Sequence, residues 1–554
     1  MFKVHINSGL QSGRYGRKNM KSKLKTLILF PLLSFVFLLV CSLDGNEVYT
    51  QDRESICSNL KGVSIPASRI GLPTNGATVQ SATFVWKTGK YSKNRGFCKV
   101  LGAIHPVDKN APDIHFQVNL PTNWNHKLLQ VGGGAFDGVL VTGLGASIGK
   151  PLASPDALSK GYVTFGSDSG HQGKSLDGSF ALNDEALANF ASDQLKKTKD
   201  VALELVGARY HSKPSQVYFF GRSNGGREAL KVVQRFPAEY DGVIVLYPAL
   251  NWVSKAVKDN QNANALYANN GAAWISPAEN RLINETVLNA CDSLDGVTDG
   301  IVSHITACAK KSNHILTFLS KHLSKEKVDI IKLFNSPLRF NYPLANGLTV
   351  TPGYSQLQGA NISESRLSQY GTSPLKRKNF VSRLGDGVIK YMVVRDKDFN
   401  PVHFNPDQWK AQVVKASQLL DATDPNLSKF KASGGKLILL HGTADQIVTP
   451  YSSVDYYNKL VDRFGKSSLD QFVQFYLVPG YGHRRSEAFT MRADLLGALD
   501  TWVVDGKRPV NLVAQDQNAD TFGRTRPLCE YPTYPKYKGK GNVNAAANFT
   551  CAAP

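Results

Sequence analysis

Short continuous runs of apolar residues recur along this chain, and several are followed directly by a glycine-rich turn. The clearest runs are residues 217–220, 436–440 and 472–478, with shorter ones at 128–131 and 161–165. Such runs, which lack polar alternation, indicate strands that are buried on both faces of a sheet. Helices are predicted at residues 226–236, 325–334 and 448–457. Strands and helices in this order predict an α/β fold with a mostly parallel sheet.

One turn between a predicted strand and a predicted helix contains a serine. Ser223 is the central residue of Gly221-Arg222-Ser223-Asn224-Gly225. A sharp strand-to-helix turn raises a serine hydroxyl above the sheet, where a histidine can reach it. Glycines flank such a serine because the tight turn leaves no room for a Cβ atom. A surface turn is the alternative, but the flanking strand and helix favour a nucleophile.

Two later strand ends supply the other members of a catalytic triad. Asp445 follows the apolar run at 436–440, and His483 follows the run at 472–478. The chain order serine, aspartate, histidine is that of the α/β-hydrolases. Asp445 as a helix N-cap and His483 as an ordinary loop residue are the alternatives. All three residues follow the ends of predicted strands, and this agreement favours the triad over the alternatives.

A tetrahedral oxyanion needs backbone N–H donors that are already in place. The amide of Asn224, directly after the nucleophile, is the first predicted donor. The second is predicted in the glycine-rich loop after residues 128–131, at Gly132 or Gly133.

An acidic loop occupies residues 291–301. It contains Asp292, Asp295 and Asp299, with glycines that allow the loop to fold back on itself. Carboxylate and carbonyl oxygens are the ligands that Ca²⁺ prefers, although the spacing is not that of an EF-hand. An acidic turn closed by a disulfide is the alternative. A calcium ion here would be structural, because a serine nucleophile needs no metal.

Length and composition fit a large enzyme. The chain has 554 residues, of which 42% are hydrophobic. We predict an α/β-hydrolase core formed by residues 42–250 and 436–554. A large inserted lid domain, residues 251–435, lies between the two parts and contains the acidic loop.

The start of the chain resembles an export signal. Residues 1–41 contain seven basic and no acidic residues, and residues 26–40 are an apolar stretch that ends directly before Cys41. A signal peptide or a lipoprotein leader is predicted, with Met1 or Met20 as the first residue. Export makes the protein secreted or periplasmic, and lipid anchored if Cys41 is modified.

Charge does not point to nucleic acid. The formal net charge is +21, and it is +14 without residues 1–41. No basic helix, stacking motif or zinc pattern accompanies it, so we predict a solvated basic surface, no nucleic-acid partner, and membrane contact only through a lipid on Cys41.

Several segments together resemble the tannase and feruloyl esterase family, which includes mono(2-hydroxyethyl) terephthalate hydrolases. They are the nucleophile turn with Gly225-Gly226-Arg227, the segments 132–136, 167–171, 234–237 and 240–242, and the turn before His483. The resemblance implies a serine esterase that cleaves aromatic or phenolic acid esters through an acyl-serine intermediate. Its substrates would be small aromatic esters or esterified polysaccharides and polyphenols.

The resemblance also implies ligands and crosslinks. Calcium would be held by the side chains of Asp292, Asp295 and Asp299 and the carbonyls of Val297 and Ile301. Without Cys41, six cysteines remain and permit fifteen pairings. The family pattern implies local pairs, which are Cys57 with Cys98, Cys291 with Cys308 and Cys529 with Cys551. Such disulfides indicate an oxidising compartment.

One departure from the family concerns the residues beside the triad. The family joins a cysteine next to the serine to a cysteine next to the histidine, and this chain has Arg222 and Arg484 there. Unpaired buried charge is costly, so we expect carboxylates such as Glu228 or Glu487 nearby, or partial exposure of the arginines. Two alternatives to an esterase are an acyltransferase on the same fold and a catalytically degenerate glycan-binding module.

Overall fold

The computed structural model describes residues 52–86, 96–145, 156–363 and 368–554. Residues 53–554 form one compact unit. The predicted leader, with Met20 and Cys41, lies outside the described residues. Within them, no helix is both long and apolar enough to span a membrane.

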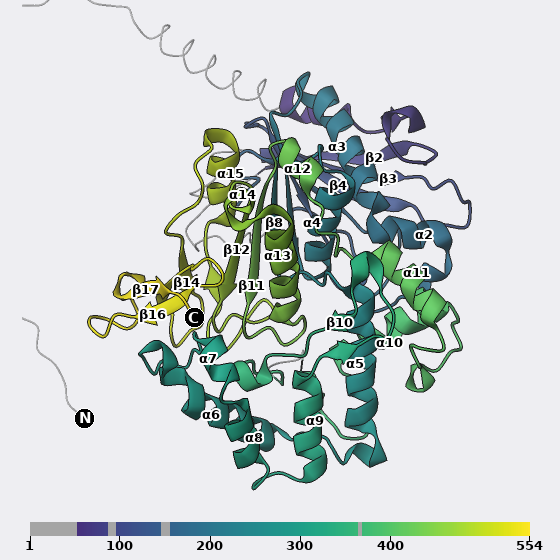
Figure 1. Cartoon of the computed structure of the whole chain (residues 1–554). Coiled ribbons are helices and arrows are strands. Elements are labelled where there is room, and N and C mark those ends of the chain that lie inside the picture. Colours follow the sequence, from purple (N-terminus) through teal and green to yellow (C-terminus); the bar gives the residue numbers. More distant parts are fainter. Residues whose placement is uncertain (1–51, 87–95, 146–155, 364–367) are drawn as a thin grey trace, which may run out of the picture. The chain divides into compact units, whose positions relative to one another are not determined.

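A ten-stranded mixed sheet forms the centre of the described part of the chain (Figure 1). The strand order is β1-β2-β3-β4-β6-β5-β7-β8-β11-β12. Pairing is antiparallel from β1 to β4 and between β4 and β6, and parallel from β6 through β5, β7, β8 and β11 to β12. The bounds are β1 Ser64–Ile65, β2 Ala77–Trp86, β3 Gly96–Ile104, β4 Ile114–Pro121, β5 Lys127–Val131, β6 Val163–Ser167, β7 Gln216–Arg222, β8 Gly242–Leu246, β11 Lys436–Gly442 and β12 Val473–Val478.

The apolar runs form strands because both faces of the sheet are covered. In β8, Ile244 and Leu246 pack in one buried cluster with Trp502, whereas Val243 belongs to another cluster with Leu230. Every residue of β8 is therefore buried. This burial explains why the strand has no polar alternation.

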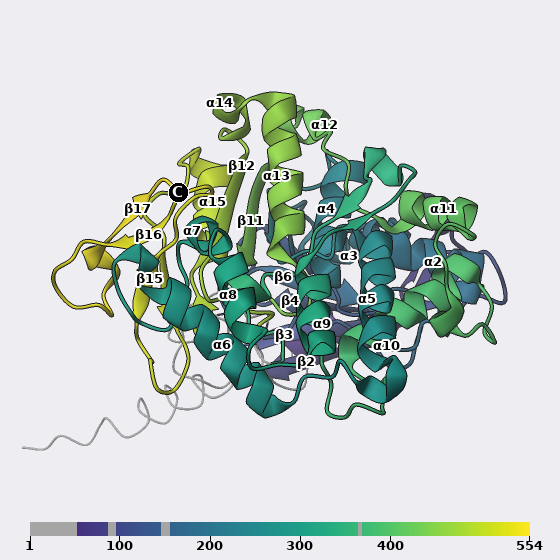
Figure 2. The same cartoon turned by 60° about the horizontal axis from the view of Figure 1, so that its bottom comes forward.

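Helices flank the sheet and form the insertion. Those of the core are α2 Asp184–Ala188, α3 Gln194–Tyr210, α4 Asn224–Arg235, α13 Pro450–Phe464, α14 Lys466–Leu469 and α15 Leu495–Asp505, with a π-helical turn at Asn189–Asp193. Between β8 and β11 lie α5 Trp252–Tyr267, α6 Pro277–Cys291, α7 Ile305–Ala309, α8 Ser312–Leu319, α9 Lys325–Asn335, α10 Phe380–Gly387, a π-helix at Val388–Val394, α11 Lys410–Leu420 and α12 Ser428–Ala432. Figures 1 and 2 show α5, α6, α8 and α9 gathered at one end of the strands.

Short strands form the rest of the structure. They are β9 Leu338–Arg339 with β10 Val350–Thr351, β13 Met491–Arg492 with β14 Val513–Asp516 and β15 Thr525–Pro527, and β16 Tyr534–Tyr537 with β17 Phe549–Ala552. Strands β8 and β11 are neighbours in the main sheet, and the chain between them forms helices α5 to α12 with β9 and β10. The predicted lid boundaries at 251 and 435 stay a prediction.

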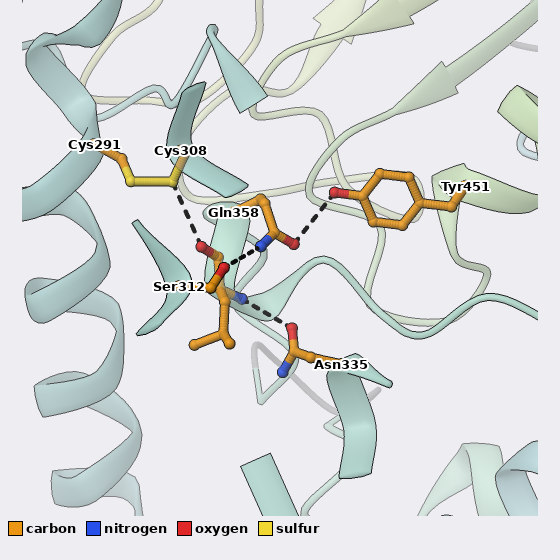
Figure 3. The surroundings of a disulfide bond; sticks show 7 residues. Cys291, Cys308, Ser312, Asn335, Gln358 and Tyr451 are labelled. Carbon is orange, nitrogen blue, oxygen red and sulfur yellow. Dashed lines mark hydrogen bonds between the residues drawn. A yellow bond between two sulfur atoms is a disulfide. The ribbon is translucent and has the colours of Figure 1, made fainter. Parts of the chain in front are cut away.

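The three local disulfides are confirmed: Cys57–Cys98, Cys291–Cys308 and Cys529–Cys551. Figure 3 shows the second of them beside a contact between the insertion and the core. Tyr451 of α13 donates a hydrogen bond to Gln358 Oε1 (3.2 Å), and Gln358 Nε2 donates to Ser312 Oγ of α8 (3.1 Å). Helix α8 is thus connected to α13, the helix that follows Asp445.

Candidate active site

Ser223 lies in a strained turn between β7 and α4. Its backbone has φ 59° and ψ −122°, a region that non-glycine residues rarely adopt. A Cβ atom on Gly221 would lie 1.8 Å from the carbonyl oxygen of Gly225, so this neighbour must be glycine. The strand-turn-helix geometry expected around the serine is therefore observed.

The three side chains expected to converge do so. His483 Nε2 lies 3.1 Å from Ser223 Oγ, and His483 Nδ1 lies 2.9 Å from Asp445 Oδ2. A carboxylate can only accept, so Nδ1 donates to it and Nε2 is left to accept the serine hydroxyl. This arrangement can remove the proton from a nucleophilic serine.

Asp445 is fully buried and held ionised by its surroundings. It does not cap α13, whose N-cap is Thr449. Its Oδ1 accepts from the amides of Ile447 (2.8 Å) and Val448 (2.9 Å). Burial alone would raise the pKa of Asp445, but the charges and hydrogen bonds of His483 and His441 outweigh burial and hold that pKa well below its usual range.

His441 was not identified from the sequence. It is fully buried at the end of β11, and its Nε2 lies 3.4 Å from Asp445 Oδ2. Its Nδ1 lies 2.8 Å from Ser453 Oγ. Its place four residues before Asp445 was the available signal, but a strand residue alone does not show which way its side chain points.

The glycine loop requires a correction to the predicted oxyanion donors. The amide of Gly132 donates to the carbonyl of Phe220 (2.9 Å), and the amide of Gly133 donates to Glu228 Oε2 (2.9 Å). Both N–H groups are therefore directed away from a substrate. The two residues are glycines for a different reason, since a Cβ on Gly132 would lie 2.6 Å from Glu228 Oε2 and one on Gly133 would lie 1.9 Å from Asp137 Oδ1.

Three other amides, beside the nucleophile or in the glycine loop, are free to bind an oxyanion. Within the described part of the chain, the N–H groups of Asn224, Gly134 and Ala135 have no hydrogen-bond acceptor. Gly134 and Ala135 line the cavity that contains Ser223. These amides, with Asn224 as predicted, can stabilise an oxyanion.

A buried polar network holds the oxyanion region in place. Asn224 Nδ2 donates to Asp137 Oδ2 (2.9 Å), which also accepts from Ser169 Oγ (2.8 Å). Arg227 is fully buried, and its Nε donates to Asn224 Oδ1 (2.7 Å). Burial raises the pKa of Glu228 well above its usual range, with a further rise from Asp137. Asp137 was not identified from the sequence, because its partners lie far away along the chain.

Two cavities meet at Ser223. The larger, of about 640 Å³, is lined by the glycine loop, His483, Arg222 and Arg484. The smaller is mostly apolar, with Trp252 and Ile447 among its lining residues. Ser223 therefore lies between a large cavity that contains two arginines and a small apolar one of about 20 Å³.

The carboxylates expected beside the two arginines are engaged elsewhere. Glu228 binds Gly133, and Glu487 accepts from Asn361 (3.5 Å). Among the residues that the structure describes, neither Arg222 nor Arg484 forms an ion pair. Arg222 is half-buried and Arg484 is exposed, so partial exposure, the second expectation, is what the structure shows.

The acidic loop only partly resembles a cation cage. Among the described residues, no group of three or more His, Cys, Asp or Glu side chains is arranged around a metal position. Asp292 accepts from the amides of Asp299 (3.2 Å) and Gly300 (2.9 Å), and Asp299 pairs with Arg526. Asp295 is different, because its Oδ2 is buried without a hydrogen-bond partner among those residues.

The electrostatic surroundings of Asp295 nevertheless favour the binding of a cation. Burial, followed by repulsion from Asp299 and Asp292, raises the pKa of Asp295 to about 6. A divalent ion beside Asp295 Oδ2 would relieve both the desolvation and the repulsion. The residues therefore fit calcium at Asp295, while Arg526 competes for Asp299.

Comparison with known proteins agrees with this geometry. The family model for tannase and feruloyl esterase matches residues 98–552. An uncharacterized esterase of Agrobacterium fabrum (strain C58 / ATCC 33970) is 38% identical, over 91% of this chain and 94% of its own length. The mono(2-hydroxyethyl) terephthalate hydrolase of Piscinibacter sakaiensis is 28% identical, over 82% and 85%. Feruloyl esterase B from Aspergillus oryzae has the same fold, with a TM-score of 0.73 and 21% identity over 90% of this chain and 100% of its own.

Proposed function

We propose that this chain, which belongs to the tannase and feruloyl esterase family of carboxylic ester hydrolases, is a serine esterase for aromatic or phenolic acid esters. The observation that carries the proposal is the continuous hydrogen-bond chain Ser223–His483–Asp445 at the floor of a cavity. A serine is a weak nucleophile until a neighbouring base takes its proton, and this chain supplies that base.

Each group has a definite task in the reaction. His483 Nε2 removes the Ser223 proton as Oγ attacks the ester carbonyl, while Asp445 stabilises the imidazolium that forms. The amide of Asn224, with that of Gly134 or Ala135, stabilises the oxyanion. The C–O bond of the ester then breaks, and His483 protonates the departing alcohol. Water, deprotonated by His483, hydrolyses the acyl-serine and returns the free acid.

The apolar cavity supports an aromatic substrate. Trp252, Leu384 and Ile447 lie along its wall, directly beside Ser223 and Ala135. An aryl ring that packs against these residues would remove apolar area from water. Relatives named feruloyl esterase point in the same direction.

The proposal is tested by hydrolysis of methyl ferulate, methyl gallate and methyl butyrate by the purified protein. We expect the aromatic esters to have the higher kcat/KM and Ser223→Ala to abolish turnover. A fluorophosphonate should label the wild type and leave Ser223→Ala unlabelled. Turnover that persists in Ser223→Ala would refute the mechanism, and a preference for butyrate would refute the substrate class.

We further propose that the acidic loop holds a structural calcium ion through Asp295 and its neighbours and that the protein is exported. The orphaned Asp295 Oδ2 supports the first proposal. The three disulfides support the second, because such crosslinks persist in oxidising compartments. Calcium binding is measured by titration calorimetry on chelator-treated protein, and export by the location of the expressed full chain in cell fractions.

A further inference from the structure

Two arginines flank the proposed catalytic pair. Arg222 directly precedes Ser223 at the end of β7, and Arg484 directly follows His483. Both line the cavity of about 640 Å³ that contains the serine and the histidine. Arg484 has a φ of 80°, a backbone conformation that costs free energy in a non-glycine residue.

Both arginines line the same cavity as a buried tyrosine, Tyr247. Tyr247 is buried, and its ring centre lies 4.7 Å from that of His483. Burial raises the pKa of Tyr247, and Arg222 and Arg484 both oppose that rise. The two positive side chains thus reach one cavity from separate strand ends.

No described carboxylate forms an ion pair with either arginine, in contrast to other arginines of the chain; Asp137, which also lines the cavity, is bonded to Asn224 and Ser169. Arg524 pairs with Asp516 and Arg526 with Asp299, while neither Arg222 nor Arg484 has an ion-pair partner in the described residues. The nearby Asp445 is committed to His483. The cations are thus available to an anion that enters the cavity.

This arrangement affects catalysis. Removal of the Ser223 proton creates a positive imidazolium at His483, beside two charges of the same sign. Like charges repel more strongly in a partly dehydrated cavity than in water. A negative charge on the substrate would offset the repulsion and be attracted by both arginines, because guanidinium and carboxylate groups match in geometry.

We propose that Arg222 and Arg484 bind a carboxylate carried by the substrate, so that the enzyme prefers anionic esters to neutral esters of the same shape. The proposal rests on the esterase function proposed above and names the substrate class of that site. The uncharged part of the ester packs against the apolar residues beside Ser223, and the arginine-lined cavity receives the carboxylate.

Matched ester pairs test the preference. Methyl 4-carboxybenzoate is compared with methyl 4-carbamoylbenzoate, which places the charge on the acyl part, and 4-carboxyphenyl acetate with 4-carbamoylphenyl acetate, which places it on the alcohol part. The anionic member of at least one pair should have the higher kcat/KM, and the pair that responds shows which part of the ester enters the arginine-lined cavity. Equal values in both pairs would overturn the proposal.

Variants separate this recognition from a general effect on activity. Arg222→Gln and Arg484→Gln should each lower the anionic-to-neutral ratio of kcat/KM by about fivefold, as expected for partly exposed charges. Arg485→Gln is the matched control, because Arg485 is exposed and is not among the residues that line the cavity. A ratio that is unchanged in the double variant would overturn the proposal.

A binding measurement on a protein that cannot hydrolyse esters tests the arginine site separately from catalysis. Calorimetric titration of Ser223→Ala with 4-carbamoylbenzoate should show binding that weakens in Ser223→Ala/Arg222→Gln/Arg484→Gln and persists in Ser223→Ala/Arg485→Gln. Equal affinity in all three proteins would overturn the arginine site. Loss of ester hydrolysis in the wild type, with this binding pattern intact, would instead overturn the esterase function alone.

Discussion

Replacing Asp445 by asparagine removes one charge and leaves the size of the side chain almost unchanged. The amides of Ile447 and Val448 donate to Asp445 Oδ1, so the oxygen of the asparagine is retained at that position. The new Nδ2 then stands where Oδ2 lies, 2.9 Å from His483 Nδ1. An amide nitrogen can only donate, so the imidazole proton moves to Nε2, the atom that faces Ser223.

That tautomer cannot accept the serine proton, and the imidazolium loses its carboxylate partner. A change of this kind lowers kcat by about 10⁴-fold, or about 5.5 kcal/mol in activation free energy. The carboxylate of the wild type is ionised near neutrality, because the neighbouring histidines outweigh burial and depress its pKa.

The assay is the initial rate of methyl ferulate hydrolysis, measured with the melting temperature of each variant. Asp455→Asn is the matched control, since Asp455 is exposed on α13 and undergoes the same chemical change. We expect the control to retain its rate. A correctly folded Asp445→Asn protein with kcat within about tenfold of the wild type would refute the assignment of the tautomer to Asp445.

Chelation with EDTA should lower Tm in calorimetry more than it lowers the kcat of protein that remains folded; a fall in kcat with constant Tm would contradict a structural ion. In calcium-free buffer Asp295→Asn should be more stable than the wild type at neutral pH but not at pH 4. The pKa of Asp295 is raised to about 6 in the folded protein, so ionisation of this carboxyl lowers the stability of the wild type as pH rises from about 4 to about 6. Arg227→Lys should lower the free energy of unfolding in urea by about 3 kcal/mol and reduce kcat, since lysine cannot replace the bond to Asn224 and the bonds to buried carbonyls; an unchanged urea midpoint would contradict this. Replacement of Cys291 and Cys308 by serine should lower the free energy of unfolding by about 3 kcal/mol in the same urea measurement. The disulfide that is lost closes a short loop, with a sequence separation of 17.

The geometry of the triad could be predicted from the sequence because strand ends determine it. In a parallel sheet the carboxyl ends of neighbouring strands meet at one edge, and β7, β8, β11 and β12 are neighbours here. Residues directly after buried runs therefore come together even when 260 positions separate them, as Ser223 and His483 do. Local burial patterns were sufficient for this inference.

The oxyanion loop could not be predicted in the same way. Its glycines were visible, but the direction of each N–H depends on Phe220 and Glu228, which lie on β7 and α4. The sequence does not distinguish a glycine that is needed for close packing from one that is needed for anion binding. Asp137 and His441 were missed for a related reason, because a buried polar side chain is explained only by its partners.

The amino-acid sequence was therefore enough to predict the fold class, the three catalytic candidates and the departure from the family at Arg222 and Arg484. Only the folded chain shows which amides lack an acceptor, which carboxylates are already paired, and that the two arginines form no ion pair among the described residues. The physical reason is that strand burial and turn geometry are encoded over a few neighbouring residues. Hydrogen-bond and charge partners are chosen across the whole fold, where donors and acceptors from distant segments compete.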